Sequence, residues 1–308
     1  MSLGFLLLVL YSCSSGGEAN PLTQTNEVAK YKMNIYADSA VSSLLEQQVE
    51  IFEKEVPQLD IITSYHNGEQ VYRGFLEGKY CDVWLTTQYT DEQLAKMQKS
   101  GNYYPYQYPI ANTAMALIVH KENAMEKISI EEFKHVVETG LSDKVKAIVV
   151  EDGEGALLRN ILQNLLIAKP SDKMYSLNSY NEVIDYVIQN KESIGIINFA
   201  HLSNQYSDRV KGILEKVKVL PVEMKDSLNR PFLTMASQGD IANHTYPLLS
   251  RIGYASCMDT LEYKRLWINW LHSAKSSRIT LKAGLIPERM PERNILVHKD
   301  SIPLPPNK

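Results

Sequence analysis

The sequence predicts an α/β protein with a largely parallel sheet. Short apolar segments with strand-like patterning alternate with segments of helical periodicity along most of the 308 residues. This alternation is typical of helices packed on the faces of a parallel sheet. The length indicates about two domains or lobes, and an apolar content of 44% is ample for a packed core.

The first part of the chain contains three strand and helix pairs. Serine or threonine precedes two of the helices and can cap them, and Pro57 ends the first helix. The expected strands cover residues 32–37, 59–65 and 81–87, and the expected helices begin at Ser42 or Ser43, at Glu69 (69–76) and after Thr90 (91–98).

A second α/β unit follows, and the chain then returns to the first. Ser129 and Ser179 are placed to cap two of its helices, and Glu132 completes a capping-box spacing after Ser129. Trp267 and Trp270, three positions apart on a helix, are expected in the core. The expected strands are 114–119, 146–150, 193–199, 217–222 and 246–257, and the expected helices are 131–138, 154–168, 181–189 and 261–273.

Both ends of the chain differ from this pattern. Residues 14–30 are small and polar and predict a flexible tether, and the proline-rich end, from Pro287 to Pro306, predicts a loose tail. Residues 4–11 form an apolar run too short for a bilayer span, which needs about 20 residues. The run matches the apolar core of a secretory signal. A core strand or an anchor of another type is the alternative.

The segment Leu10-Tyr11-Ser12-Cys13 resembles a bacterial lipobox. The resemblance implies that Cys13 becomes the lipidated first residue of the mature protein, which is held on the membrane of the cell envelope, facing the periplasm or the surface. Residues 1–13 are then a lipoprotein signal segment.

Composition and cysteine count exclude several classes of function. A net charge of −4 with a pI near 6.0 argues against nucleic-acid binding, which needs a clustered basic face. Cys81 and Cys257 remain after Cys13, and they form neither a disulfide scaffold nor a metal-ligand spacing. They could pair in an oxidising compartment, although we interpret them as buried free thiols. No histidine pair has metal-ligand spacing, so neither a metal nor a cofactor is expected.

Three strand-to-helix junctions predict an oxyanion site. A helix start directs free N–H groups and the positive end of its dipole outwards, and glycine lets the backbone approach a ligand closely. The expected ligand contacts are Ser39, Ala40 and Val41 through backbone N–H groups, Thr86 and Thr87 through hydroxyl and amide groups, and Gly153, Glu154, Gly155 and Ala156 at a helix start.

Four segments together resemble the phosphate-type (PstS-like) periplasmic solute-binding proteins of ABC importers. They are Asp82 with Thr86-Thr87 and Thr90-Asp91-Glu92, the stretch from Asn178 to Ile197, Tyr246-Pro247-Leu248 with Arg251 and Tyr254, and Ala283-Gly284-Leu285-Ile286-Pro287.

The resemblance implies a type II periplasmic binding protein fold with two α/β lobes. Two crossing strands form the hinge, and a small-molecule ligand, phosphate or another oxyanion, lies in the cleft between the lobes. An importer permease is the implied partner. The implied lobes are residues 31–115 and 116–244, with a return to the first lobe over 245–290 and a tail over 291–308.

The third junction departs from the family pattern. Val150, Glu154 and Ala156 stand where the family typically carries arginine, serine and threonine, and Thr87 replaces a charged position. The departures predict an altered site, because valine cannot replace the charge-assisted arginine–phosphate fork. Arg73, Arg159 and Arg251 are the candidates to supply the missing base. Glu154 either recognises a cation or an amine, or only stabilises a helix start.

No nucleophile, metal or cofactor motif is present, so we expect a binding protein and not an enzyme. Two hypotheses remain: a lipid-anchored solute-binding protein with an altered ligand, and a binding-degenerate sensory or partner-binding lipoprotein. They differ in whether Ser39, Thr86 and Gly155 converge on one cleft with a basic group in reach.

Overall fold

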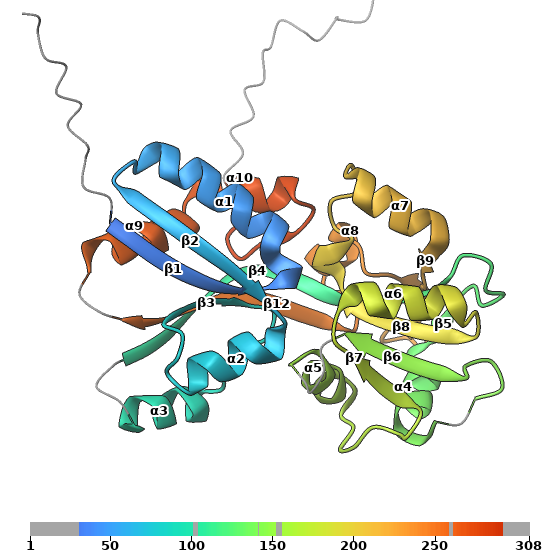
Figure 1. Ribbon diagram of the computed structural model, residues 1–308. Coiled ribbons are helices and arrows are strands. Elements are labelled where there is room, and N and C mark those ends of the chain that lie inside the picture. The colour runs from blue at the N-terminus through green and yellow to red at the C-terminus, as the bar shows by residue number, and fades with distance from the viewer. Residues whose placement is uncertain (1–30, 101–103, 141, 152–155, 259–260, 292–308) are drawn as a thin grey trace, which may run out of the picture.

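Two α/β lobes lie side by side in the computed structural model, and one long sheet runs through both (Figure 1). The structure describes residues 31–100, 104–140, 142–151, 156–258 and 261–291. The predicted signal segment, the tether with Cys13, and residues 292–308 of the predicted tail lie outside the described residues. The same holds for Gly153, Glu154 and Gly155.

The first lobe is built on the strand order β2-β1-β3-β12-β4. Strands β1, β2 and β3 are parallel, and β12 runs antiparallel to β3. Helices α1, α9 and α10 lie on one side of this sheet and α2 and α3 on the other (Figure 1). The elements are β1 (Tyr31–Asp38), a 3-10 turn η1 (Ser39–Val41), α1 (Ser42–Glu55), β2 (Leu59–His66), α2 (Gly68–Leu76), β3 (Asp82–Leu85), α3 (Asp91–Ser100), β12 (Leu249–Met258), α9 (Glu262–Leu271), α10 (Ala274–Lys282) and β13 (Ile286–Pro287).

The second lobe continues the sheet in the order β4-β8-β6-β7. A small three-stranded sheet, β11-β10-β5, lies beside it. The elements are β4 (Tyr104–His120), β5 (Ile128–Ser129), α4 (Ile130–Thr139), β6 (Ala147–Glu151), α5 (Ala156–Leu165), β7 (Met174–Leu177), α6 (Tyr180–Gln189), β8 (Ser193–Asn198), η2 (Phe199–His201), α7 (Asp208–Lys216), β9 (Val217–Val219), β10 (Val222–Lys225), β11 (Pro231–Thr234) and α8 (Gln238–Ala242).

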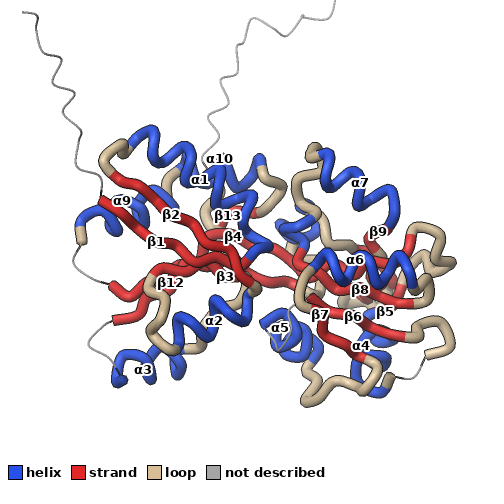
Figure 2. Tube along the Cα trace, in the orientation of Figure 1, coloured by secondary structure: helices blue, strands red, loops and turns tan. Residues whose placement is uncertain are grey.

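Strands β4 and β12 connect the lobes (Figure 2). They pair antiparallel in the first lobe as far as Ala114, which faces Leu249. From Met115, which faces Asn198, β4 pairs with β8 of the second lobe instead. The α/β fold with two lobes and two connecting strands, predicted from the sequence, is therefore confirmed.

The caps at Ser129 and Ser179 and the tryptophan core agree with the prediction, whereas the cap expected at Ser42 or Ser43 is wrong, because α1 begins at Ser42 and its N-cap Val41 makes no side-chain hydrogen bond. The Ser129 hydroxyl accepts a hydrogen bond from the Glu132 N–H, and the Ser179 hydroxyl accepts one from the Glu182 N–H. Trp267 is fully buried and packs edge-on against Phe52 of α1. These contacts join the C-terminal helices to the first lobe, which fixes the return of the chain after the second lobe.

Several boundaries differ from the prediction. The helix expected over 261–273 is two helices, because α9 ends at Leu271 and Ser273 caps α10. The strand expected over 217–222 is divided into β9 and β10, since Pro221 interrupts it. Pro287, assigned to a loose tail, pairs with Ala111 of β4 in β13. The prediction that Cys81 is buried is wrong, because it precedes β3 at an exposed bend.

None of the helices in the described ranges is both long enough and apolar enough to cross a bilayer.

Candidate ligand-binding site

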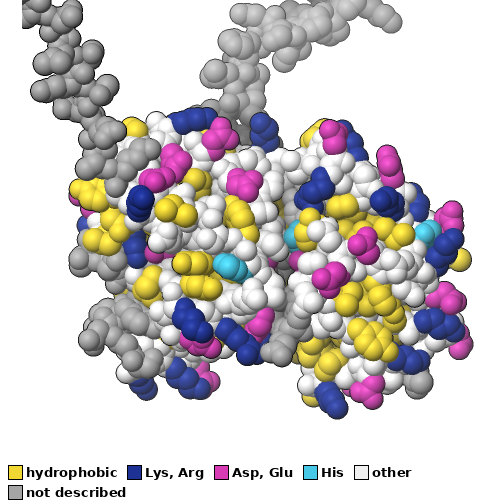
Figure 3. Space-filling view, in the orientation of Figure 1, with side chains coloured by type: hydrophobic (Ala, Val, Ile, Leu, Met, Phe, Trp, Pro, Cys, Tyr) yellow, Lys and Arg dark blue, Asp and Glu magenta, His cyan; other side chains and the backbone are white. Residues whose placement is uncertain are grey.

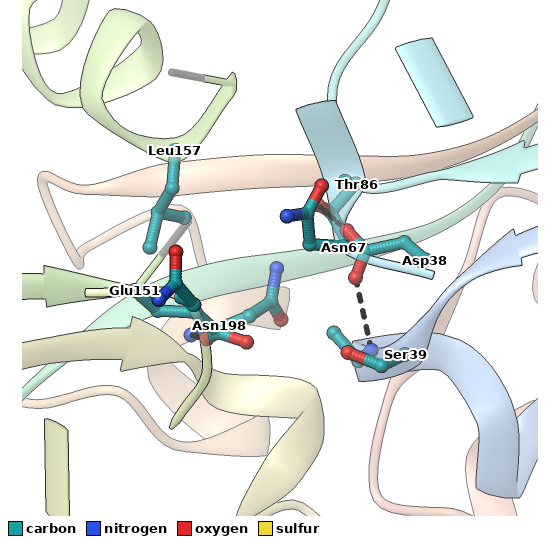
Figure 4. Close-up of a pocket in the computed structure, with 10 residues that line it drawn as sticks. Asp38, Ser39, Asn67, Thr86, Glu151, Leu157 and Asn198 are labelled. Atoms are coloured by element: carbon teal, nitrogen blue, oxygen red, sulfur yellow. Dashed lines mark hydrogen bonds between the residues drawn. The ribbon is translucent and has the colours of Figure 1, made fainter. Parts of the chain in front are cut away.

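A small pocket lies between the two lobes (Figure 4). Its volume of about 10 Å³ has room for about one water molecule. Figure 3 shows the two lobes in contact on the face turned to the viewer. The described residues that line the pocket are Asp38, Ser39, Ala40, Asn67, Gly68, Thr86, Glu151, Leu157, Asn178 and Asn198.

Four of these residues stand where strands end. Asp38, Glu151 and Asn198 are the last residues of β1, β6 and β8, and Thr86 follows β3 directly. Strands β1 and β3 are parallel, as are β6 and β8, so within each lobe these carboxyl ends meet at one sheet edge. Ligands of open α/β sheets bind at such edges.

Asp38 is held by two hydrogen bonds from the first lobe. Its Oδ1 accepts from the Ala40 N–H at 3.0 Å, and its Oδ2 accepts from the Thr86 hydroxyl at 2.7 Å. Burial raises the pKa of the Asp38 carboxyl, and the nearby Glu151 charge raises it further. The pocket therefore contains a carboxylate whose ionised form is disfavoured by its surroundings.

Glu151 faces Asp38 from the second lobe (Figure 4). Its Oε2 accepts from the Asn198 N–H at 3.1 Å, and its Oε1 lies 2.7 Å from His201 Nε2. The His201 ring stacks on Tyr180 at 3.8 Å, and Arg209 donates to both the His201 carbonyl and the Tyr180 hydroxyl. This chain of contacts fixes Glu151 at the pocket wall.

Asn198 contributes a buried hydrogen-bond donor that no described residue satisfies. Its Oδ1 accepts from the Ala200 N–H at 2.9 Å and from the Thr113 hydroxyl at 3.0 Å. These bonds fix the orientation of the amide, because a flip would place the NH₂ group against the Ala200 N–H. Asn198 is 2% exposed, and its Nδ2 has no hydrogen-bond partner among the described residues. A buried donor of this kind is costly unless a ligand or water satisfies it.

Helix α5 fastens the second lobe to the first. Arg159 Nη2 lies 3.1 Å from Glu69 Oε2 on α2, and its guanidinium lies 4.6 Å from the Tyr72 ring centroid. Asn160 Nδ2 is within 3.4 Å of the Thr86 carbonyl and the Thr87 hydroxyl. The structure therefore represents the lobes in a closed arrangement.

The structure brings only some of the predicted ligand residues to the pocket. Ser39, Ala40 and Thr86 line it, whereas Val41 is buried in the core and the Thr87 hydroxyl contacts Asn160. Ala156 begins α5, and the other three residues of the third junction lie outside the described ranges.

The arginines considered as replacement bases lie elsewhere. Arg73 and Arg159 both bind the Glu69 carboxylate, and Arg251 lies on an exposed position of β12. The described lining residues include two carboxylates and no lysine or arginine. The described part of the chain also has no cluster of three or more His, Cys, Asp or Glu side chains placed to hold a metal.

Asp38, Asn178 and Asn198 were not among the predicted ligand residues, nor was Asn67, which caps α2. The available signal is a polar residue at the carboxyl end of an apolar strand, as in Ile35 to Asp38 and Ile194 to Asn198. Neighbouring strands must be known before such residues can be grouped into a site.

The chain belongs to the PBP superfamily domain family of periplasmic binding proteins, which it matches over residues 23–275. The resemblance predicted from the sequence is confirmed at this level. No curated protein sequence gives a significant match to the chain.

Solved structures share the fold at low sequence identity. A substrate-binding protein assigned to a phosphate ABC transporter of Clostridium perfringens, with phosphate bound, aligns with a TM-score of 0.67 and 15% identity, over 84% of this chain and 100% of the other. An ABC-type phosphate transport receptor from Vibrio cholerae aligns with a TM-score of 0.60 and 14% identity, over 83% of this chain and 100% of the other. The regulatory domain of an OxyR2 variant from Vibrio vulnificus aligns with a TM-score of 0.51 and 11% identity, over 80% of this chain and 96% of the other. At these identities the similarity shows the fold alone.

Proposed function

We propose that this protein is a lipid-anchored, extracytoplasmic solute-binding protein of an ABC importer with an altered ligand site. The observation that carries the proposal is the interlobe pocket, where buried polar side chains from both lobes converge at strand ends. The Asn198 Nδ2 group, which has no partner within the described ranges, supports a ligand-binding role over a degenerate site, since a buried donor of this kind is costly to keep unsatisfied.

The pocket charges favour a solute other than fully ionised phosphate. Asp38 and Glu151 both line the pocket, and no basic side chain stands among the described lining residues. Two unit charges about 4 Å apart in a partly buried site repel by about 4 kcal/mol, which corresponds to roughly a thousandfold in affinity. We infer that the solute donates hydrogen bonds to the carboxylates and accepts one from Asn198.

The proposed fold of a solute-binding protein divides the chain into two lobes and a tail. The lobes are residues 31–115 and 116–244, with a return over 245–290 and a tail from 291. The change of partner along β4, from β12 at Ala114 to β8 at Met115, supports the first boundary. A solute larger than one water enters only when the lobes separate about β4 and β12.

A thermal-unfolding screen tests the ligand class. The purified protein is unfolded with phosphate, sulfate, and neutral or amine-bearing solutes at millimolar concentration. A ligand at about 100 times its dissociation constant adds about 2.7 kcal/mol, which raises the midpoint by several degrees. We expect a shift with a hydrogen-bond-donating solute that disappears in Asp38→Asn and survives in Asp60→Asn, since Asp60 lies at the opposite end of the sheet. No shift with any solute would contradict the proposal.

A fractionation experiment tests the anchor separately. The native chain is expected in the membrane fraction with a lipid-modified Cys13, because two or more acyl chains hold a protein stably. Cys13→Ser should leave the protein out of the membrane fraction. Equal distribution of the two chains would contradict lipid anchoring without affecting the ligand site.

A further inference from the structure

Cys81, which directly precedes β3, lies opposite Cys257 of β12. The antiparallel ladder of β3 and β12 includes the pair Asp82 and Ser256, and the two cysteines are the next residues outward. The Cys257 N–H donates to the Cys81 carbonyl at 2.8 Å, so the pairing continues through them. Opposite residues of antiparallel strands have Cα atoms about 4.5–5.5 Å apart, which lies within the range of disulfides.

The side chains of the two cysteines also lie together. A hydrogen bond with the Cys81 thiol, followed by burial, raises the pKa of the Cys257 thiol. Cys81 is exposed and Cys257 is 4% exposed, so one sulfur is open to solvent reagents and the other is covered. The Asp82 charge raises the pKa of the Cys257 thiol further, and the Lys264 ammonium, 3.0 Å from Asp82 Oδ2, lowers it by a smaller amount.

We propose that Cys81 and Cys257 form a reversible disulfide by exchange with a small or protein disulfide. The exposed Cys81 thiolate attacks one sulfur of the oxidant, forms a mixed disulfide and releases the first thiolate. The Cys257 thiol then loses its proton to solvent as its sulfur attacks the Cys81 sulfur, which forms the intramolecular bond and releases the second thiolate. Two cysteine thiols are oxidised and one disulfide of the oxidant is reduced to two thiols.

The bond would join β12 to the residue before β3 at the end of the first lobe that lies away from the second lobe. The loop closed by Cys81 and Cys257 contains the whole second lobe, so cross-linking greatly restricts the unfolded chain. At its other end β3 leads to Thr86 in the pocket. An oxidising compartment favours the disulfide, and that location rests on the proposed function. The geometry of the cysteine pair does not depend on any ligand.

Oxidation of the purified, reduced protein tests the proposal. After treatment with oxidised glutathione, both thiols should resist alkylation, the chain should remain monomeric, and a digest should yield one cross-linked peptide pair containing both cysteines. The thermal midpoint should rise by several degrees and fall again with dithiothreitol.

Two single variants make the result decisive. Cys257→Ser keeps the exposed thiol and should accumulate a glutathione adduct at Cys81, and neither it nor Cys81→Ser should gain thermal stability from the oxidant. The proposal is overturned if the native chain also stops at the glutathione adduct, if both thiols stay alkylatable, or if a Cys81–Cys81 dimer is the only product. A protein that binds no solute can still give the expected result, so this test is separate from the ligand screen.

Discussion

Arg159 of α5 lies 3.1 Å from Glu69 of α2, and this ion pair joins the two lobes beside the pocket. The Glu69 side chain is 10% exposed, so the pair is better shielded than a surface ion pair. Stacking on Tyr72 adds a cation–π contact. The pair therefore belongs to the closed arrangement and is lost when the lobes separate.

Arg159→Ala is expected to shift the unliganded protein toward an open arrangement by about 1–2 kcal/mol, the usual contribution of a partly shielded ion pair with a cation–π contact. Small-angle scattering should report a larger radius of gyration than for the native chain. Arg251→Ala, at an exposed position of β12, is the matched control and should leave the scattering unchanged. Identical curves for the native chain and Arg159→Ala would contradict this role.

Asp38→Asn is expected to stabilise the unliganded protein near neutral pH. Burial first and the Glu151 charge second raise the pKa of Asp38 above 3.8, so the folded chain holds this proton more tightly than the unfolded chain. The free energy of unfolding therefore falls as pH rises from the Asp38 pKa of the unfolded chain through the higher pKa of the folded chain. Asp38→Asn lacks this loss. Its gain in stability over the native chain should therefore be largest at neutral pH and shrink toward about pH 4. Thermal midpoints across this range measure it; a constant difference would refute the assignment.

Gly284→Ala is expected to lower the free energy of unfolding by about 2–4 kcal/mol. Gly284 has φ of +82°, and a Cβ there would overlap the Ser203 carbonyl. Gly212 of α7 is the control, because a Cβ there meets nothing within 4 Å. Gly212→Ala should be neutral or stabilising by up to about 1 kcal/mol in urea unfolding. Equal losses in both variants would contradict the steric explanation.

Lys264→Met is expected to cost about 3–5 kcal/mol, because it leaves the Asp82 charge buried without its partner. Asp82 accepts from the Tyr254 and Ser256 hydroxyls at 2.6 and 2.7 Å, and Lys264 Nζ lies 3.0 Å away. Lys275→Met breaks the exposed pair with Glu55 and should cost at most about 1 kcal/mol. Urea unfolding of both variants compares the two pairs. A small loss for Lys264→Met would show that Asp82 is adequately neutralised without it.

Local patterns predicted most of the fold. Apolar alternation located the strands of both lobes, and hydroxyl caps such as Ser129 and Ser179 located helix starts because their hydrogen bonds involve residues close in sequence. Short elements were missed because they are stabilised by residues that are distant in sequence. β13 has only two residues, and its pairing with β4 depends on contacts far along the chain.

The site was predicted less completely than the fold. The strand-to-helix rule predicted Ser39, Ala40 and Thr86, which line the candidate pocket, but it favoured residues after each strand and omitted Asp38 and Asn198 at the strand ends. The position of Glu151 opposite Asp38 depends on how the lobes close, and the local sequence does not encode it. The adjacency of Cys81 and Cys257 likewise requires the register of β3 and β12.

Calorimetric titration of phosphate into the purified protein at about pH 8, where inorganic phosphate is mainly the dianion, tests the central claim most directly. The account predicts no binding at millimolar phosphate for the native chain, because the carboxyl groups of Asp38 and Glu151 line the pocket and no lysine or arginine stands among its described lining residues. The same preparation should bind the hydrogen-bond-donating solute found in the thermal screen. Tight binding of phosphate at this pH, unchanged in Asp38→Asn, would contradict the altered site and would indicate that the protein is a phosphate-binding protein.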